Sequence, residues 1–519
     1  MKLILCLAIL TLNLSSYLTN MLYFQQNHYN IPRQINHYKH YYIPLIKHTI
    51  YSLPLVLLLL INTYEVFIRS TIGIIFIVAY ILLLNFKKHK WIKPLVYTLR
   101  VYRFTILYNI LNFVAIYGLV MNTNSYSIIL VIILYEGISQ AIFILTAIII
   151  QPIEKQIKNY YIRIAKKKLY TNNNLIKIAI SGSYGKTSTK FILNELLKDR
   201  YYTLMTPHSY NNDMGISKCI NERLNKFHDI FIIEVGADHV GEITKLAKFI
   251  KPDYALITSI GPQHLETFKT MPNIIHEKMQ LIEFIKPSGT AFINLDNYHI
   301  KNYHIYNNIN KITYSLEDPS ANYYATNITY NSKGSSFDII HNNLTYHYST
   351  ILLGKHNISN ILSAIVIANY LNISMQTLIS YVSNLNYIEH RLQLIQRGNY
   401  TIIDNSYNSN PSSAKNSLEV LSKMPNIRII ITPGMVDLGR IQELENYNFG
   451  TLMKDKTDIV ILVGERITKQ LYLGLKESSF NMHNVYITSS FKEAYSMLDS
   501  LAKVATVLIE NDLPDNFII

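Results

Sequence analysis

The pattern of apolar and polar positions changes near residue 150. Before that point apolar residues form long, almost unbroken runs, and after it short apolar runs alternate with segments of helix length. A helix needs about 20 apolar residues to cross the hydrocarbon core of a bilayer. Short buried strands that alternate with helices predict a parallel sheet with ligand sites at the carboxyl ends of its strands. The pattern therefore predicts an α-helical transmembrane region followed by an α/β part.

Five apolar runs in the first region approach the length of a membrane span, although the third is short. They are Leu3–Leu18, Ile50–Phe67, Ile72–Phe86, Phe104–Val120 and Ile128–Ile150. No small-residue cleavage site follows the first run, which favours a span over a removed signal peptide. The loop at Arg69 is short, so four and five spans both remain open. We expect a multi-span region of about five helices over residues 1–150.

Basic residues gather next to the apolar runs. The net charge of +14 would also suit a nucleic-acid-binding protein, but much of the excess lies in two clusters after the third and fifth runs. These clusters are Lys87, Lys88, Lys90, Lys93, Arg100 and Arg103, and Lys155, Lys158, Arg163, Lys166, Lys167 and Lys168. Cytoplasmic loops of membrane proteins carry this bias and face anionic lipid. We therefore expect a multi-pass protein of the cell membrane whose later domains are cytoplasmic, with membrane lipid and not nucleic acid as a partner.

A glycine-rich segment, Ser181–Lys190, follows the apolar run Leu175–Ile180 and precedes a stretch of helix length. This order places a turn at the start of a helix, where backbone N–H groups bind phosphate. Lys186 would neutralise the β- and γ-phosphate oxygens, and the Thr187 hydroxyl would ligate Mg²⁺. The first glycine of the usual G-x-x-x-x-G-K-[ST] motif is absent, because Ile180 occupies its place. The context still favours an ATP site over an ordinary glycine-rich turn.

The shortened loop G-S-Y-G-K-T-S and the motifs that follow it resemble, in order, those of the Mur ligase family. The motifs are Asn211–Gly215, Glu234–Ala237, Thr258–Glu266, His276–Lys278, Gly354–Asn360, His390–Leu392, Asp404–Pro411 and Pro433–Gly439. The last two are most similar to the MurF-type branch of the family. The resemblance implies a central P-loop-type ATPase domain over residues 173–387 and a Rossmann-like C-terminal domain over residues 388–519. A basic juxtamembrane linker over residues 151–172 would join them to the membrane region.

The resemblance also implies an activity. The MurF-type branch adds D-alanyl-D-alanine to a muramyl tripeptide in peptidoglycan precursor synthesis, through an acyl phosphate and with ATP converted to ADP. The implied substrates are therefore a muramyl peptide and D-Ala-D-Ala, with other cell-wall synthesis enzymes as partners. Two alternatives remain open. One is a related ligase for another acceptor, such as a poly-γ-glutamate synthase-like protein or an enzyme for a lipid-linked precursor. The other is a membrane protein that binds nucleotide without catalysis.

Individual residues receive roles from the same resemblance. The implied catalytic residues are Lys186, His264 and Lys278. Thr187 and Glu234 would hold a first Mg²⁺, and His264 would lie near a second. Lys278 would assist metal binding as a carbamate formed with CO₂. The implied nucleotide-binding residues are Gly182, Ser183, Gly185, Lys186, Thr187, Ser188, Asn357, Asn360, Arg391 and Asp404.

Plainer roles remain open for several of these residues. Lys278 could pair with a nearby acid such as Glu277 or Glu283. Asn357 and Asn360 lie three positions apart, so they could share a ligand or could cap and pack a helix. Arg391 and Asp404 lie beyond a candidate domain boundary near Leu385–Glu389, which suggests that the C-terminal domain closes over ATP.

Two departures from the family pattern stand out. The MurF-type branch has the pattern D-D-x-Y-N-x-N-P, but Asn405 replaces its second Asp here. The N-terminal domain that grips the uridine nucleotide in the family is not recognisable, and the apolar runs occupy its place. The resemblance therefore supports the ATP chemistry more directly than the acceptor substrate.

Overall fold

The computed structural model describes residues 16–27, 29–40, 94–122, 127–407, 409–436 and 438–511. The chain divides into two compact units, one made chiefly of Met1–Asn159 and the other of Tyr160–Leu513. The predicted runs Ile50–Phe67 and Ile72–Phe86, and Leu3–Leu18 up to residue 15, lie outside the described residues.

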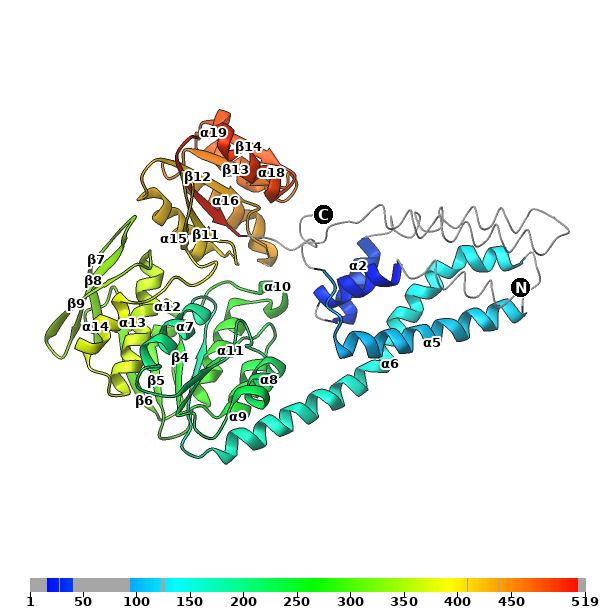
Figure 1. Cartoon of the computed structure of the whole chain (residues 1–519), viewed down its shortest axis with the longest axis horizontal. Coiled ribbons are helices and arrows are strands. Elements are labelled where there is room, and N and C mark those ends of the chain that lie inside the picture. Colours follow the sequence, from blue (N-terminus) through cyan, green and yellow to red (C-terminus); the bar gives the residue numbers. More distant parts are fainter. Residues whose placement is uncertain are drawn as a thin grey trace. The chain divides into compact units, whose positions relative to one another are not determined.

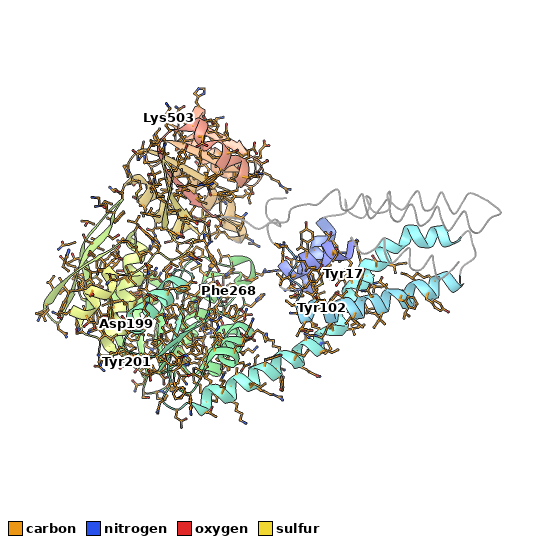
Figure 2. All side chains as sticks on the ribbon, in the orientation of Figure 1. Tyr17, Tyr102, Asp199, Tyr201, Phe268 and Lys503 are labelled. Atoms are coloured by element: carbon orange, nitrogen blue, oxygen red, sulfur yellow. The ribbon has the colours of Figure 1, made fainter. Side chains whose placement is uncertain are left out.

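Helices make up the described part of the first unit (Figure 1). A helix over residues 16–26 is followed by α2 (Ile31–His40), α5 (Leu99–Asn122) and α6 (Ser127–Thr171). Aromatic rings join three of these helices. Phe143 of α6 lies 4.8 Å from the ring of Phe104 and 6.2 Å from that of Tyr17, which is labelled in Figure 2. A small apolar core therefore packs the described helices of this unit against one another.

Large apolar side chains also face outward from α5 and α6. On α5 they are Leu99, Tyr102, Ile106, Ile110, Phe113, Val114 and Tyr117, and on the first-unit part of α6 they are Leu145, Ile148, Ile149 and Ile153. By length and composition, one helical stretch in the described part, Ile138–Thr171, could cross a membrane, and 33% of its most apolar window is buried. One such stretch is weak evidence by itself, so the multi-span region and its number of spans stay predictions.

The predicted linker over residues 151–172 is largely helical. α6 continues through Pro152 to Thr171, and its end belongs to the second unit. Ala165 and Leu169 are buried in a core cluster of that unit. The Lys168 ammonium donates to the Asn221 carbonyl at 3.0 Å. The end of α6 is thus a docked element of the second unit.

The larger of the two sheets in the second unit has nine strands, in the order β2-β3-β1-β4-β5-β6-β7-β8-β9. In this order, all neighbouring strands from β2 to β7, including β1, pair in parallel, whereas β8 pairs antiparallel with both β7 and β9. The strands are β1 (Ile176–Ser181), β2 (Thr203–Met205), β3 (Ile230–Glu234), β4 (Tyr254–Ile257), β5 (Thr290–Asn294), β6 (Asn310–Ser315), β7 (Tyr323–Asn331), β8 (Gly334–His341) and β9 (Leu344–Thr350). All residues of β3 and β5 are buried, which explains their short, continuous apolar runs.

Helices cover both faces of the parallel part of this sheet. Ile178 and Ile180 of β1 join one core cluster, whereas Ala179 between them joins another, as the two-residue period of a strand requires. The first cluster includes residues of α7 (Lys186–Leu197), α13 (Lys355–Tyr370) and α14 (Met375–Ser383). The second includes residues of α8 (Asp213–Arg223), α9 (Glu242–Ile250), α10 (Leu265–Phe268), α11 (Met271–Glu283) and α12 (Tyr298–Lys301).

A second sheet has the order β10-β11-β15-β12-β13-β14, with only β10 antiparallel to its neighbour. Its strands are β10 (Gln393–Arg397), β11 (Tyr400–Asn405), β12 (Ile427–Thr432), β13 (Ile459–Val463), β14 (Val485–Thr488) and β15 (Ala505–Glu510). Its helices are α15 (Pro411–Ser422), η1 (Gly439–Ile441), α16 (Gln442–Leu452), α17 (Lys469–Glu477), η2 (Met482–Asn484), α18 (Phe491–Ser496) and α19 (Leu498–Leu501). The predicted α/β fold is therefore confirmed.

Candidate active site

The glycine-rich turn after β1 is pressed against two other motifs. Gly182 and Gly185 have φ values of +146° and +83°, a backbone region that side chains rarely adopt. A Cβ on Gly182 would clash with the Thr258 hydroxyl, and one on Gly185 would lie 2.6 Å from the Asn360 amide oxygen. Glycine at both positions therefore lets the turn approach the loop after β4 and the start of α13.

Lys186 opens α7 and folds back over the turn. Its ammonium donates to the carbonyls of Gly182 at 2.6 Å and Ser183 at 3.2 Å. Desolvation lowers the pKa of Lys186; Glu234 opposes this effect, and Arg391 reinforces it. Its role beside bound phosphate stays a prediction. Ser188, another predicted nucleotide-binding residue, is buried on α7.

Glu234 ends β3 and is almost fully buried. Its Oε2 accepts from the Thr187 hydroxyl at 3.0 Å, which brings the two predicted ligands of the first Mg²⁺ together. The same oxygen accepts from the Lys190 ammonium at 3.0 Å, and Oε1 accepts from the Asn211 amide at 3.2 Å. Lys190 is not among the site residues predicted from the sequence. Its position four residues after Lys186, on the same face of a helix, was the available signal.

His264 caps α10 and has a φ of +52°. Its Nε2 lies 3.3 Å from Asp238 Oδ1, so the structure pairs it with an acid that sequence reasoning did not select. No cluster of three His, Cys, Asp or Glu side chains suited to a metal occurs in the described part of the chain. Of the predicted ligands, Thr187 and Glu234 are therefore in contact with each other, whereas His264 is paired with Asp238, which was not predicted.

The loop that carries His264 is tied to the phosphate loop. The Ser183 hydroxyl donates to the Gly261 carbonyl and accepts from the Gly261 N–H, both at 3.0 Å. The Tyr184 hydroxyl donates to the Pro262 carbonyl at 2.6 Å. Ser183 therefore has a structural contact that its predicted nucleotide role did not include, and Tyr184 is a positioning residue that sequence reasoning missed.

Lys278 lies on α11 with an exposed fraction of 1%. Burial, and next the repulsion of Lys186, lowers the pKa of Lys278 to about 7. The two acids suggested as its partners, Glu277 and Glu283, form hydrogen bonds with other groups. Glu277 accepts from the N–H groups of Gly241 and Ile243 at the start of α9, and Glu283 accepts from two backbone N–H groups. Lys278 is therefore a buried amine that loses its proton near neutral pH.

The two asparagines on α13 differ in their contacts. The Asn360 amide oxygen accepts from the Thr189 hydroxyl at 3.2 Å, which places it against the phosphate-loop helix. Asn357 is buried on α13 and donates to the Leu353 carbonyl at 2.9 Å, so it packs at the start of the helix, whose N-terminus has no side-chain cap. Burial lowers the pKa of the adjacent His356 to about 4, and Arg391 adds to this effect. His356 is therefore uncharged at neutral pH.

Arg391 and Asp404 come from the second sheet region. The Arg391 guanidinium lies 4.2 Å from the centroid of the Tyr407 ring, a cation–π contact. The Tyr407 hydroxyl is hydrogen-bonded to that of Ser209, so the two α/β parts touch here. Asp404 accepts from His390 Nδ1 at 2.7 Å, so its carboxylate has a partner in this structure.

Asn405 has a structural explanation. Its amide donates to Glu510 Oε2 at 2.8 Å, and the Ser409 hydroxyl donates to the other Glu510 oxygen at 2.5 Å. Burial raises the pKa of Glu510, which is fully buried. An aspartate at 405 would have no N–H to offer this acid. Asn405, which departs from the family pattern, is therefore the hydrogen-bond donor that buried Glu510 at the end of β15 requires.

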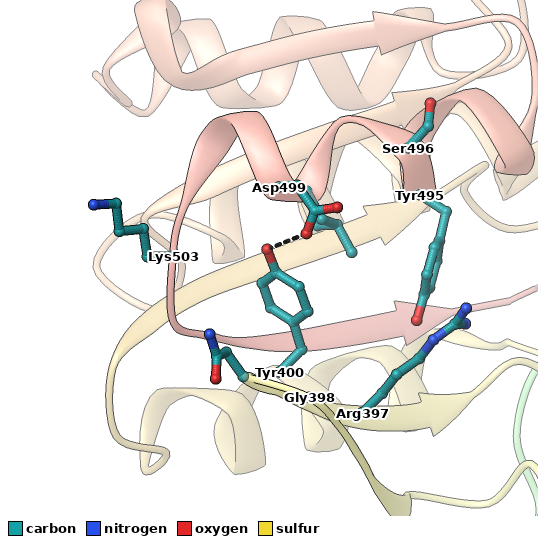
Figure 3. Close-up of a pocket in the computed structure, with 9 residues that line it drawn as sticks. Arg397, Gly398, Tyr400, Tyr495, Ser496, Asp499 and Lys503 are labelled. Carbon is teal, nitrogen blue, oxygen red and sulfur yellow. Dashed lines mark hydrogen bonds between the residues drawn. The ribbon is translucent and has the colours of Figure 1, made fainter.

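A separate pocket lies at the other end of β11 (Figure 3). Its lining includes Arg397, Tyr400, Tyr495 and Lys503, and the Tyr400 hydroxyl donates to Asp499 Oδ1 at 2.8 Å. None of the predicted site residues lines it.

The fold and the site define the class of protein: a nucleotide-binding enzyme of two α/β domains with a phosphate loop at the carboxyl end of a parallel sheet. The family models for the "Mur ligase middle domain" and the "Mur ligase, glutamate ligase domain" match residues 180–368 and 390–510. The chain belongs to the Mur ligase family. This membership makes it an ATP-dependent ligase that forms C–N bonds.

Curated relatives support the same family. The chain is 30% identical over 340 residues to a UDP-N-acetylmuramoyl-tripeptide–D-alanyl-D-alanine ligase of Buchnera aphidicola, covering 65% of this chain and 72% of the relative. It is 30% identical over 292 residues to the ligase of that name from Escherichia coli, covering 56% of this chain and 64% of the relative. The predicted family, and its MurF-type branch, are confirmed.

Solved structures show the same fold. MurF from Acinetobacter baumannii matches with a TM-score of 0.62 at 23% identity, covering 68% of this chain and 77% of that one. MurF ligase from Thermotoga maritima in complex with ADP matches with a TM-score of 0.62 at 21% identity, covering 68% and 80%.

Proposed function

We propose that this ligase joins D-alanyl-D-alanine to a UDP-N-acetylmuramoyl tripeptide in peptidoglycan precursor synthesis. The observation that carries the proposal is the 30% identity to the Buchnera aphidicola ligase of that name, which extends over 72% of the relative's length. The contacts among the phosphate loop, Glu234 and the loop of His264 support the ATP chemistry that this reaction needs.

The reaction would have two steps. The tripeptide carboxylate attacks the γ-phosphorus of ATP, which forms an acyl phosphate and releases ADP; the dipeptide amine then attacks the acyl carbon and expels phosphate. The first step brings together two anions, so fixed positive charge must offset their repulsion. Lys186 and Arg391, with the N–H groups at the start of α7, would supply that charge and hold the phosphates.

Magnesium fits the residues at the end of β3. Mg²⁺ prefers hard oxygen ligands, and the Thr187 hydroxyl and a Glu234 carboxylate oxygen already lie 3.0 Å apart. His264 and Asp238 would stand near a second ion. Bound Mg²⁺ would neutralise phosphate oxygens during transfer.

Lys278 fits a carbamate. Only a neutral amine reacts with CO₂, and a pKa of about 7 leaves much of this lysine neutral at physiological pH. The amine nitrogen would bond to the CO₂ carbon and lose a proton, which turns a buried cation into an anion. The repulsion from Lys186 that lowers this pKa would become an attraction.

We further propose that the first unit binds the cell membrane, with both catalytic domains in the cytoplasm and cell-wall synthesis enzymes nearby. The outward apolar side chains of α5 and α6 support lipid contact, as does the basic stretch after Ile153. The same surface favours a second candidate function, ligation on a lipid-linked muramyl acceptor.

The test is phosphate release by full-length protein purified in detergent. Mg·ATP, UDP-N-acetylmuramoyl tripeptide and D-Ala-D-Ala are supplied together and then omitted one at a time, and the products are weighed by mass spectrometry. Lys186→Ala should abolish release, whereas Lys198→Ala at the exposed end of α7 should not. A pentapeptide that requires all three components would support the first proposal. A parallel assay replaces the UDP-linked tripeptide with a lipid-linked one, and product in that assay alone would support the second proposal and contradict the first.

A further inference from the structure

Lys190 is a buried charge that the proposed function does not use. It lies one turn after Lys186 on α7, and its side chain has an exposed fraction of 0%. Its ammonium lies 3.0 Å from Glu234 Oε2 and also donates to the His208 carbonyl. A lysine is very rarely buried so completely unless it is paired, because desolvating the ammonium is costly.

The loop from Thr206 to Asn211 wraps around this ion pair. At its first end, the Thr206 hydroxyl accepts from the Glu234 N–H at 3.1 Å. At its last end, the Asn211 amide donates to Glu234 Oε1, and the Asn211 carbonyl accepts from the Gly236 N–H at 2.8 Å. Lys190 binds the middle of the loop through His208. One lysine thus fixes both the carboxylate and the loop around it.

The electrostatic surroundings of Glu234 are strongly positive. Glu234 interacts with Lys186, Lys190 and Arg391, and Arg391 also interacts unfavourably with both lysines. A divalent cation that reached Glu234 alone would meet one carboxylate and three like-charged neighbours. A nucleotide triphosphate would reverse that balance, since it brings several negative charges to the same place.

We propose that Lys190 is a positioning residue that holds Glu234 and the Thr206–Asn211 loop in place and makes divalent-cation binding depend on bound nucleotide. The inference rests on the metal site of the proposed function. Lys190 keeps the Glu234 carboxylate aimed at Thr187 while its charge repels free cations. Coupling of this kind is reciprocal, so the factor by which nucleotide tightens metal binding equals the factor by which metal tightens nucleotide binding.

The test measures Mn²⁺ binding by electron paramagnetic resonance on full-length protein in detergent, without turnover. Titrations are run with and without AMP-PNP, and Mn²⁺ bound by free nucleotide is subtracted. In the wild type, AMP-PNP should tighten Mn²⁺ binding at least tenfold. Lys190→Gln keeps a hydrogen-bond donor but removes the charge, so it should bind Mn²⁺ alone at least tenfold more tightly than the wild type. Lys190→Arg keeps the charge and should behave like the wild type.

A matched control is Lys198→Gln, which removes an exposed charge from the same helix and should leave the coupling unchanged. Equal Mn²⁺ affinity with and without AMP-PNP in the wild type would overturn the inference without any variant, even if Lys190→Gln failed to fold. Tighter Mn²⁺ binding in both Lys190→Gln and Lys190→Arg would also overturn it, because charge would then not be the cause. No Mn²⁺ binding even with AMP-PNP would instead remove the proposed metal site, and this inference with it.

Discussion

Lys190 and Lys278 are both buried lysines, but their partners give them different chemistry. Lys190 is paired with Glu234 at 3.0 Å, whereas the acids beside Lys278 along α11 accept hydrogen bonds from backbone groups. An unpaired buried ammonium loses its proton more easily, because burial penalises the charged form. Lys278 is therefore the one of the two suited to react as a neutral amine.

The carbamate proposal predicts a dependence on CO₂ that changes with pH. In the wild type, removing dissolved CO₂ should slow phosphate release, and bicarbonate should restore it. The response should be steeper at pH 6 than at pH 8, because below a pKa of about 7 the lysine is mostly protonated and unreactive. Lys278→Arg stays charged, so its turnover should fall roughly 10–100-fold and ignore bicarbonate.

Lys286→Arg is the control for this experiment, since Lys286 pairs with Asp253 and is 40% exposed. A Lys278→Arg enzyme with wild-type turnover would contradict the carbamate role.

Asn405 gives a stability prediction. Asn405→Asp would place a second acid against buried Glu510, and should lower the free energy of unfolding by about 2–4 kcal/mol at pH 8. Burial raises the pKa of Glu510, so the folded state favours the protonated acid, and this preference is lost as pH rises. The deficit should therefore be smaller at pH 5 than at pH 8. Urea unfolding at both pH values measures it.

Adding Glu510→Gln to Asn405→Asp restores an amide donor to the pair, and should recover most of the lost stability. An Asn405→Asp variant as stable as the wild type at pH 8 would show that the site admits water or relaxes.

The sequence predicted some residues of the site better than others. Thr187 and Glu234 were predicted to share a role because their motifs are distinctive, and they are in contact. The partners of Asp238 and Asn405 could not be predicted, since each contact joins positions that only the folded sheet brings together. The burial of Lys278 could not be predicted either, because a lysine in a helix, between Glu277 and Met279, is expected to lie on the surface.

At the scale of elements, two loops act as one body. The turn after β1 and the loop after β4 are joined by Ser183 and Tyr184, so the positions of Lys186 and His264 are linked. The spacing of the glycine-rich motif predicted the first loop. It could not predict that Gly261 has to be small, since that need arises from the Tyr184 ring.

Gly261→Ala should therefore disturb both loops. Its Cβ would lie 2.8 Å from Tyr184 Cε2, too close for any side chain. We expect a loss of about 1–3 kcal/mol in the free energy of unfolding, from overpacking, and a higher KM for ATP. Combining it with Tyr184→Ser removes the clashing ring and should recover stability. Thermal unfolding and ATP titration measure the two effects, and an unchanged KM in Gly261→Ala would show that the loops adjust independently.

At the scale of the whole molecule, the order of motifs predicted two α/β parts, and the structure contains them. It did not predict where the second unit begins. The basic stretch around Lys166 reads as a linker beside lipid, yet Ala165 and Leu169 on the same turns are buried in the catalytic core. With Ile162 they form a helical stripe at spacings of three and four, a signal that the surrounding charges obscured.

This docking predicts different stabilities for two fragments of the chain. A fragment of residues 160–519 keeps the end of α6, whereas residues 173–519 lose it. The shorter fragment should unfold with a free energy roughly 2–5 kcal/mol lower, because it exposes the surface that Ala165 and Leu169 cover. Leu169→Ala in the longer fragment should reproduce part of this loss, and Lys167→Ala, at an exposed position of the same helix, should not. Urea unfolding compares all four. Equal midpoints for the two fragments would mean that the end of α6 is only a linker. The expected difference would instead make it a structural part of the catalytic unit. Apolar contacts would then hold it in place, independently of what its basic side chains bind.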